Sequence, residues 1–173
     1  MNVLSGVVAL AAATVLLVPV APADAQAFSD KFCPEATQYV VALGKLTQSA
    51  TAQQVYDTAH ATTNAYETCA TRSLSNGLIE PQVHYAYARQ GSFGIIEARA
   101  LVALNRVADA KRVLQNGRRL ASDVYDWRSD SKRPSDYHDA AKDILDATDA
   151  MLAKLSQPPA ATGAPAPASS PHR

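Results

Sequence analysis

The chain has 173 residues, of which 47% are hydrophobic and only 6% aromatic, and its 16 basic and 16 acidic side chains cancel at pH 7. This length suggests one domain, and the absence of net charge argues against a nucleic-acid partner, because phosphate binding needs a clustered basic excess. Alanine carries much of the apolar content, which favours helix over sheet.

The N-terminal stretch has the pattern of an export signal. An apolar run over Val3–Val18 is followed by the small-residue sequence Ala23–Ala25. This pattern is typical of a signal peptide, so we predict cleavage after residues 1–25 and a periplasmic or extracellular protein without a stable membrane span. The pair Met1-Asn2 lacks the usual basic residue, and a retained membrane anchor is the alternative, although the run is short for a span of about 20 residues.

Cys33 and Cys69 are the only two cysteines. In an exported protein an even pair indicates one disulfide, which would join the first predicted helix to the end of the second. A redox or metal-binding pair is the alternative, and the spacing argues against it because it is unlike CxxC. We therefore predict a structural Cys33–Cys69 bridge.

Two helices are expected in the region that contains the cysteines. The first is predicted over residues 34–47, because Pro34 suits the first helical position. The second is predicted over residues 52–74, with Thr51 as its N-cap. Residues 62–64 are polar, so we expect the middle of this helix to pack loosely or to face a cleft.

Three more helices are expected further along the chain. The third begins near Pro81, and Gly91 and Gly94 weaken its middle by about 1 kcal/mol each relative to alanine, so we expect a kink or a break there. The fourth is predicted over residues 108–127. The fifth, over residues 136–155, carries a regular apolar stripe.

The clearest structural feature that the sequence predicts is a bend at Asn105. Leu101 and Leu104 precede it and Val107 and Ala110 follow it, at helical spacing on both sides. Asparagine tolerates the left-handed conformation that ends a helix. We expect two helices to fold back on each other here, with alanines at the contact.

The pattern Ala-x-x-Leu-x-x-Leu-Asn-Arg-x-x-Asp-Ala-x-x-x-Leu, which runs from Ala98 to Leu114, resembles the tetratricopeptide-repeat helical hairpin. In that family Gly or Asn marks the turn, and an alanine of the second helix packs on the first. The resemblance covers residues 93–119. No Trp opens the first helix, no Pro closes the second and no clear 34-residue repeat follows. The resemblance implies that the inner helices, here the second and third predicted helices, line a peptide groove.

These predictions give an all-α domain over residues 26–156, with four to five antiparallel helices in a tetratricopeptide-like or bundle arrangement. Residues 157–173 are rich in Pro and Ala, with Ser and Thr. Such a segment cannot bury enough apolar area to offset its ordering entropy, so we predict a disordered tail.

Two charged helix faces are candidate ligand sites. On the fifth helix five acidic residues recur every three or four positions, but a straight helix makes them diverge, whereas Ca²⁺ needs converging ligands. We expect a solvated face there. The fourth helix is basic, and it either pairs with the acidic face or offers a patch for an acidic peptide or anionic lipid. The acidic residues are Asp136, Asp139, Asp143, Asp146 and Asp149, and the basic ones are Lys111, Arg112, Arg118 and Arg119.

No catalytic or metal-binding motif is recognisable. His60, His84 and His138 fall on different predicted helices without HExxH or CxxCH spacing, which argues against zinc and haem. Neither GxSxG, SxxK nor a Gly-rich phosphate loop occurs, and nothing marks Glu67, Glu80 or Glu97 as catalytic. We expect no enzyme, no cofactor and no metal.

The candidate binding residues are an aromatic and hydrogen-bonding set. Tyrosine and arginine are enriched in recognition surfaces because they join a flat apolar body to a polar tip. A core role for these tyrosines is the alternative. The function predicted is a non-catalytic interaction protein of the bacterial cell envelope that binds a protein or peptide, and the alternative is a periplasmic bundle for a small ligand or a metal. The set comprises Tyr56, Tyr66, Tyr85, Tyr87 and Arg89.

Overall fold

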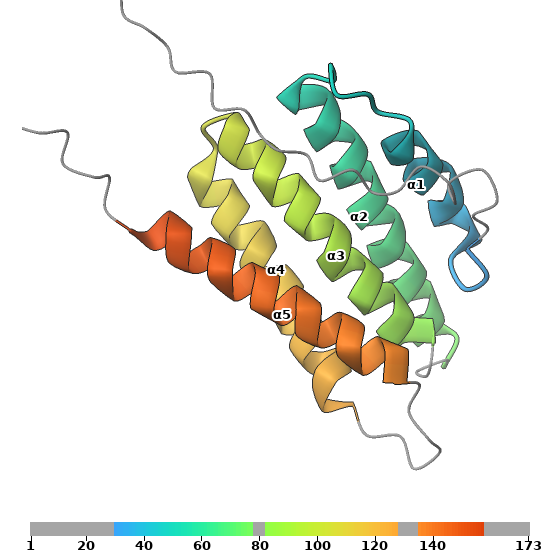
Figure 1. Ribbon diagram of the computed structural model, residues 1–173. Coiled ribbons are helices and arrows are strands. Elements are labelled where there is room, and N and C mark those ends of the chain that lie inside the picture. The colour runs from blue at the N-terminus through green and yellow to red at the C-terminus, as the bar shows by residue number, and fades with distance from the viewer. Residues whose placement is uncertain (1–29, 78–81, 128–134, 158–173) are drawn as a thin grey trace, which may run out of the picture.

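A computed structural model describes residues 30–77, 82–127 and 135–157 (Figure 1). Helices and connecting turns are the only structure within these ranges, which confirms the predicted all-α fold. The expected signal segment and nearly all of the expected C-terminal tail lie outside the described residues. The prediction of three domain segments therefore stays a prediction.

Within the described ranges, five α-helices follow a short 3₁₀ turn. Consecutive helices pack against each other, and α3 contacts α2, α4 and α5 (Figure 1). The smaller α1 lies against α2. Any site that uses α2, α3 and α4 therefore has α3 at its centre. The elements are η1 (Pro34–Ala36), α1 (Thr37–Gly44), α2 (Ala52–Ser75), α3 (Gln82–Ala103), α4 (Val107–Asp126) and α5 (Ser135–Ser156).

The first helix is shorter than the predicted range of 34–47. Its first turn is 3₁₀, and the α-helix ends at Gly44. None of its residues is fully buried, so tertiary packing gives it little support against its low intrinsic stability. The second helix begins as predicted, because Thr51 and Gln54 form a reciprocal capping box.

The bend at Asn105 is confirmed. Asn105 has a φ of 59°, and it is the one non-glycine residue with positive φ among those described. Its N–H donates to the carbonyl oxygen of Val102 at 3.0 Å, and the Arg106 N–H donates to that of Leu101 at 2.8 Å. These two bonds form a Schellman motif, which satisfies the carbonyls at the end of α3 and turns the chain into α4. Ala98 and Ala110 are both fully buried at this hairpin, as expected of a close helix contact.

The expected break near Gly91 and Gly94 is wrong, because α3 runs unbroken through both glycines. Gly91 lies where α3, α4 and α5 meet. A Cβ atom placed on it would lie 3.1 Å from Cγ2 of Ile144 and 3.4 Å from the carbonyl oxygen of Gly117. Tertiary packing that only a missing side chain permits thus outweighs the low helix propensity of glycine.

No helix in the described part of the chain is both long enough and apolar enough to cross a membrane.

Candidate functional site

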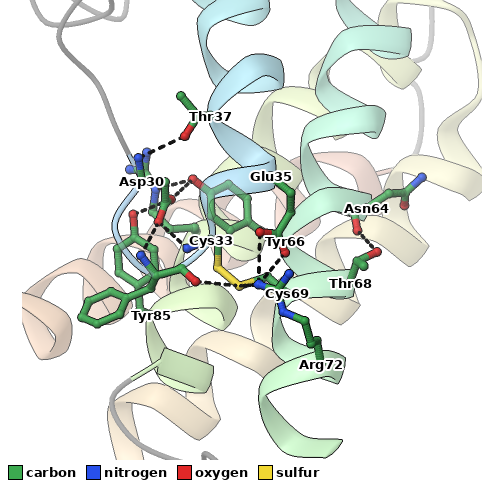
Figure 2. The surroundings of a disulfide bond; sticks show 12 residues. Asp30, Cys33, Glu35, Thr37, Asn64, Tyr66, Thr68, Cys69, Arg72 and Tyr85 are labelled. Carbon is green, nitrogen blue, oxygen red and sulfur yellow. Dashed lines mark hydrogen bonds and ion pairs between the residues drawn. A yellow bond between two sulfur atoms is a disulfide. The ribbon is translucent and has the colours of Figure 1, made fainter. Parts of the chain in front are cut away.

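The predicted disulfide between Cys33 and Cys69 is confirmed, with Cα atoms 5.6 Å apart and both residues fully buried (Figure 2). It joins the segment before α1 to the C-terminal half of α2. Disulfides persist in oxidising compartments, so this bridge is compatible with a secreted or periplasmic protein.

Asp30 organises the interior beside the disulfide. Its Oδ1 atom accepts hydrogen bonds from the backbone N–H groups of Phe32 at 3.0 Å and Cys33 at 2.7 Å. Its Oδ2 atom accepts from the hydroxyls of Tyr66 at 2.7 Å and Tyr85 at 2.8 Å (Figure 2). Arg89 Nε donates to the Tyr66 hydroxyl at 3.3 Å, which places a positive charge near this buried carboxylate. Three of the five predicted binding residues therefore meet, but they meet inside the protein.

Both phenols in this network hold their protons strongly. Burial raises the pKa of Tyr66 to about 12, with the hydrogen bond from Arg89 opposing and the hydrogen bond to Asp30 reinforcing the shift. Burial and the bond to Asp30 also raise the pKa of Tyr85. Neutral phenols are the form that donates to a carboxylate, so the network ties the start of the described chain to α2 and α3.

The other two predicted binding residues lie elsewhere. Tyr56 stacks on the ring of His60 with centroids 5.4 Å apart, and the Arg106 guanidinium lies 4.9 Å from the Tyr56 ring centre. Tyr87 is half-buried and meets His84 edge to face at 6.4 Å. The five residues thus do not form one surface.

A polar cleft lies between α2 and α4, with α3 as its floor. Its volume is about 320 Å³. We call it the α2–α4 cleft. The sequence predicted a polar stretch in the middle of α2, at residues 62–64, that packs loosely or faces a cleft. Thr63 and Asn64 of that stretch line the α2–α4 cleft. The lining residues are His60, Thr63, Asn64 and Glu67 of α2, Gln90, Gly94 and Glu97 of α3, and Arg112, Val113, Asn116 and Gly117 of α4.

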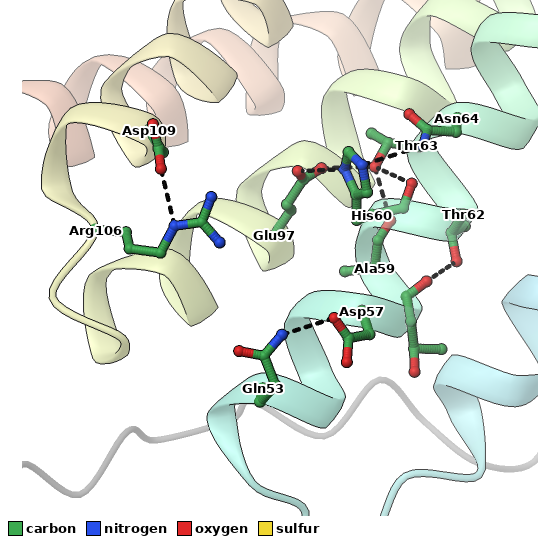
Figure 3. Close-up of polar contacts among 11 residues, drawn as sticks. Gln53, Asp57, Ala59, His60, Thr62, Thr63, Asn64, Glu97, Arg106 and Asp109 are labelled. Carbon is green, nitrogen blue, oxygen red and sulfur yellow. Dashed lines mark hydrogen bonds and ion pairs between the residues drawn. The ribbon is translucent and has the colours of Figure 1, made fainter.

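Glu97 is the buried charge of the α2–α4 cleft. Its side chain is 5% exposed, and its two oxygens have different partners (Figure 3). His60 Nδ1 lies 2.8 Å from Oε1, and the Thr63 hydroxyl donates to Oε2 at 2.7 Å. Asn64 bonds the far nitrogen of His60 at 3.2 Å, so a chain of polar groups runs from the floor of the cleft to its rim.

Gln90 and Gly94 form the rest of the floor. Gln90 is only 7% exposed, yet its amide makes no hydrogen bond to any other described residue. The amide atoms reach the open cleft, so this group is available to a ligand. Gly94 lies one turn from Gln90 and contributes no side chain, which leaves the floor hollow. These α3 residues recur at three- and four-residue spacing and therefore face the same way.

The charged helix faces show a different arrangement. Arg118 of α4 pairs with Asp149 of α5 at 2.6 Å, and Lys142 pairs with Asp146 along α5 at 2.6 Å. The basic and acidic faces thus pair with each other in part, as one of the two expectations had it. Among the described side chains, no group of three His, Cys, Asp or Glu residues could hold a metal ion.

The sequence interpretation missed Asp30, Gln90 and the role of Glu97. Asp30 carries no local signal, because its phenol partners are 36 and 55 residues away. Glu97 did carry one: it lies between the apolar positions Phe93 and Leu101 at helical spacing, where a charge is costly unless it is paired. A carboxylate on the inward face of a predicted helix was therefore the feature of the sequence that could have indicated a site.

No family model, no curated protein and no solved structure matches this chain. The tetratricopeptide resemblance therefore depends on the hairpin of residues 93–119 alone. The function has to be argued from the chemistry of the site.

Proposed function

We propose that this chain is an exported, non-catalytic interaction protein of the bacterial cell envelope, and that it binds a protein or peptide in the α2–α4 cleft. The observation that carries the proposal is the Gln90 amide, which is buried against the cleft without a protein partner among the described residues. The amide opens to the cleft, so a ligand can bond it by displacing water.

The bonding around Glu97 supports a binding role. Thr63 donates its hydroxyl proton to Glu97 and lies 2.7 Å from the carbonyl oxygen of Ala59. His60 is also directed at Glu97, and no bond joins His60 Nδ1 or Nε2 to the Thr63 hydroxyl. Thr63 and His60 thus both hold the Glu97 carboxylate in place, so that it presents a fixed charge to a ligand.

The arrangement of helices supports a partner of peptide type. Three consecutive helices enclose the α2–α4 cleft, and the α3–α4 hairpin within them is the part that resembles the tetratricopeptide repeat. In that family the inner helices line a peptide groove, so the position of the cleft agrees with the resemblance. The buried disulfide supports placement in an oxidising compartment, the periplasm or the cell exterior.

A small ligand is the second candidate. The cleft volume of about 320 Å³ lies at the lower end of the range for small-molecule sites. Native mass spectrometry of the protein purified from its own compartment separates the two candidates. A retained small molecule, lost when Gly94 is replaced by Met, would favour the small ligand over a peptide.

Site-specific photocrosslinking tests the proposed function. A photoreactive amino acid at exposed Asn116, on the rim of the cleft, should join the protein to one partner in the envelope of producing cells. The same amino acid at exposed Asp143 of α5, away from the cleft, is the control and should not. Gly94→Met, which fills the floor, should abolish the product at position 116. Equal products at both positions, or no effect of the filled floor, would reject the cleft as the binding site.

A further inference from the structure

The charges around the α2–α4 cleft indicate which chemical group of the partner it takes. Two carboxylates, Glu67 and Glu97, face two basic residues, His60 and Arg112. The Arg112 side chain is 78% exposed, so solvent screens its charge, and it shares Asp109, which is not part of the lining, with Arg106. We infer that the cleft binds the cationic end of a basic side chain, arginine or lysine, presented by the partner peptide. This inference rests on the proposed function.

Glu97 supplies the main attraction. A carboxylate has about four acceptor positions, and two of those on Glu97 are used by His60 and Thr63. Its side chain is 5% exposed, and a buried carboxylate is costly without an opposite charge. His60 supplies that charge only when it is protonated. A guanidinium or ammonium group in the cleft supplies such a charge itself and forms charge-assisted hydrogen bonds.

The floor of the cleft suits the rest of a basic side chain. Gln90 offers an amide oxygen to an N–H donor of the ligand. Gly94 leaves space above α3, and Val113 provides apolar surface beside it, 3.5 Å from where a Cβ on Gly94 would lie. Lys and Arg bury their hydrocarbon stems on such surface while their charged ends reach polar groups.

The size of the cleft and its rim agree with a single inserted side chain. A volume of about 320 Å³ cannot take a helix, which is about 10–12 Å across with its side chains. Glu67 is exposed at the rim and makes no ion pair or hydrogen bond with another described residue. It is therefore free to bond a second donor of the ligand or to attract it before binding.

Titration of the exported protein with short capped peptides, followed by nuclear magnetic resonance, tests the inference. The peptides are alanine–arginine–alanine, its citrulline counterpart, which has the same shape without charge, and its glutamate counterpart. The arginine peptide should shift the amide signals of Gly94 and Glu97 and bind about tenfold or more tightly than the citrulline peptide, as expected of charge-assisted hydrogen bonds. Equal binding of the two, or preference for the glutamate peptide, would overturn the inference.

Variants locate the effect. Glu97→Gln should abolish the preference for arginine over citrulline, whereas Asp143→Asn, on the exposed face of α5, should leave it unchanged. Circular dichroism shows whether Glu97→Gln is folded. If it is not, Glu67→Gln decides the matter, because loss of this exposed carboxylate should weaken binding about two- to fivefold. An unchanged affinity in folded Glu97→Gln, or in Glu67→Gln where that variant decides, contradicts the inference.

Two further outcomes separate this inference from the proposed function. The cleft could bind the arginine and citrulline peptides equally while crosslinking at Asn116 persists and depends on Gly94. In that case the inferred cationic ligand is rejected and the proposed partner site is retained. If both experiments fail, both proposals are rejected. Binding of arginine amide as tight as that of the peptide would overturn the peptide source and favour the small-ligand alternative.

Discussion

At the scale of single residues, two buried carboxylates have different roles. Asp30 accepts four hydrogen bonds, two from backbone N–H groups and two from phenols, and is 2% exposed. Its lone pairs are thus fully used, and Arg89 lies nearby through Tyr66. Glu97 accepts two hydrogen bonds and faces the α2–α4 cleft. A fully bonded carboxylate indicates structure, whereas a partly bonded one beside a cleft indicates a site.

Replacing Asp30 by Asn should lower the free energy of unfolding by about 1–3 kcal/mol, because the amide nitrogen cannot accept the bonds that a carboxylate oxygen accepts. Urea denaturation followed by circular dichroism measures the change. Asp57→Asn is the matched control, because exposed Asp57 accepts only one bond in the described structure, from Gln53. Equal effects of the two substitutions would show that the Asp30 network does not contribute to stability.

At the scale of elements, α3 determines how the other helices pack. It contacts α2, α4 and α5, and Gly91 of α3 meets Gly117 of α4. The two glycines differ in the space around them. A Cβ on Gly117 would lie 3.6 Å from the Cα of Gly91, an ordinary contact, whereas a Cβ on Gly91 would lie 3.1 Å from Cγ2 of Ile144.

This difference predicts opposite effects of substitution. Gly117→Ala should raise the free energy of unfolding by about 0.5–1 kcal/mol, because alanine is the better helix former and fits without displacement. Gly91→Leu should lower it by about 1–3 kcal/mol through overpacking against α4 and α5. Chemical denaturation of both variants beside the parent checks the prediction. A loss of stability in Gly117→Ala would show that the helices approach more closely there than described.

At the scale of the whole molecule, the disulfide stabilises the part of the fold around α1. The small helix α1 has no fully buried residue and packs on α2 alone among the α-helices described. The bridge from Cys33 to Cys69 spans 36 residues and includes α1 in its loop. Constraining a loop of that size in the unfolded chain stabilises the folded state, in the chain-entropy account, by about 3–4 kcal/mol.

Reductant should therefore lower the Tm of the protein, and the double variant Cys33→Ala/Cys69→Ala should melt at the same lowered temperature with or without reductant. Denaturation in urea should show a loss of about 3–4 kcal/mol in both cases. Thermal melts of parent and variant with and without reductant make the comparison. An unchanged Tm of the reduced parent would mean that the bridge does not stabilise the fold.

The sequence by itself determined the features that depend on neighbours along the chain. The turn at Asn105 and the cap at Thr51 follow from local backbone chemistry, and the helical period followed from residues three and four apart. The pairing of Cys33 with Cys69 needed no distance information, because two cysteines allow one bridge.

Tertiary structure alone decided which polar side chains meet. Tyr66 and Tyr85 were predicted as a binding surface, but they bond Asp30 inside the protein, across 36 and 55 residues. The continuity of α3 at Gly91 was also misjudged, because its low helix propensity is offset by packing against α4 and α5. Interactions between residues that are close in sequence determine the backbone dihedral angles and the helical period. Burial, and with it the energetic role of Glu97 in the α2–α4 cleft, depends on helices that the chain brings together from 37 residues apart.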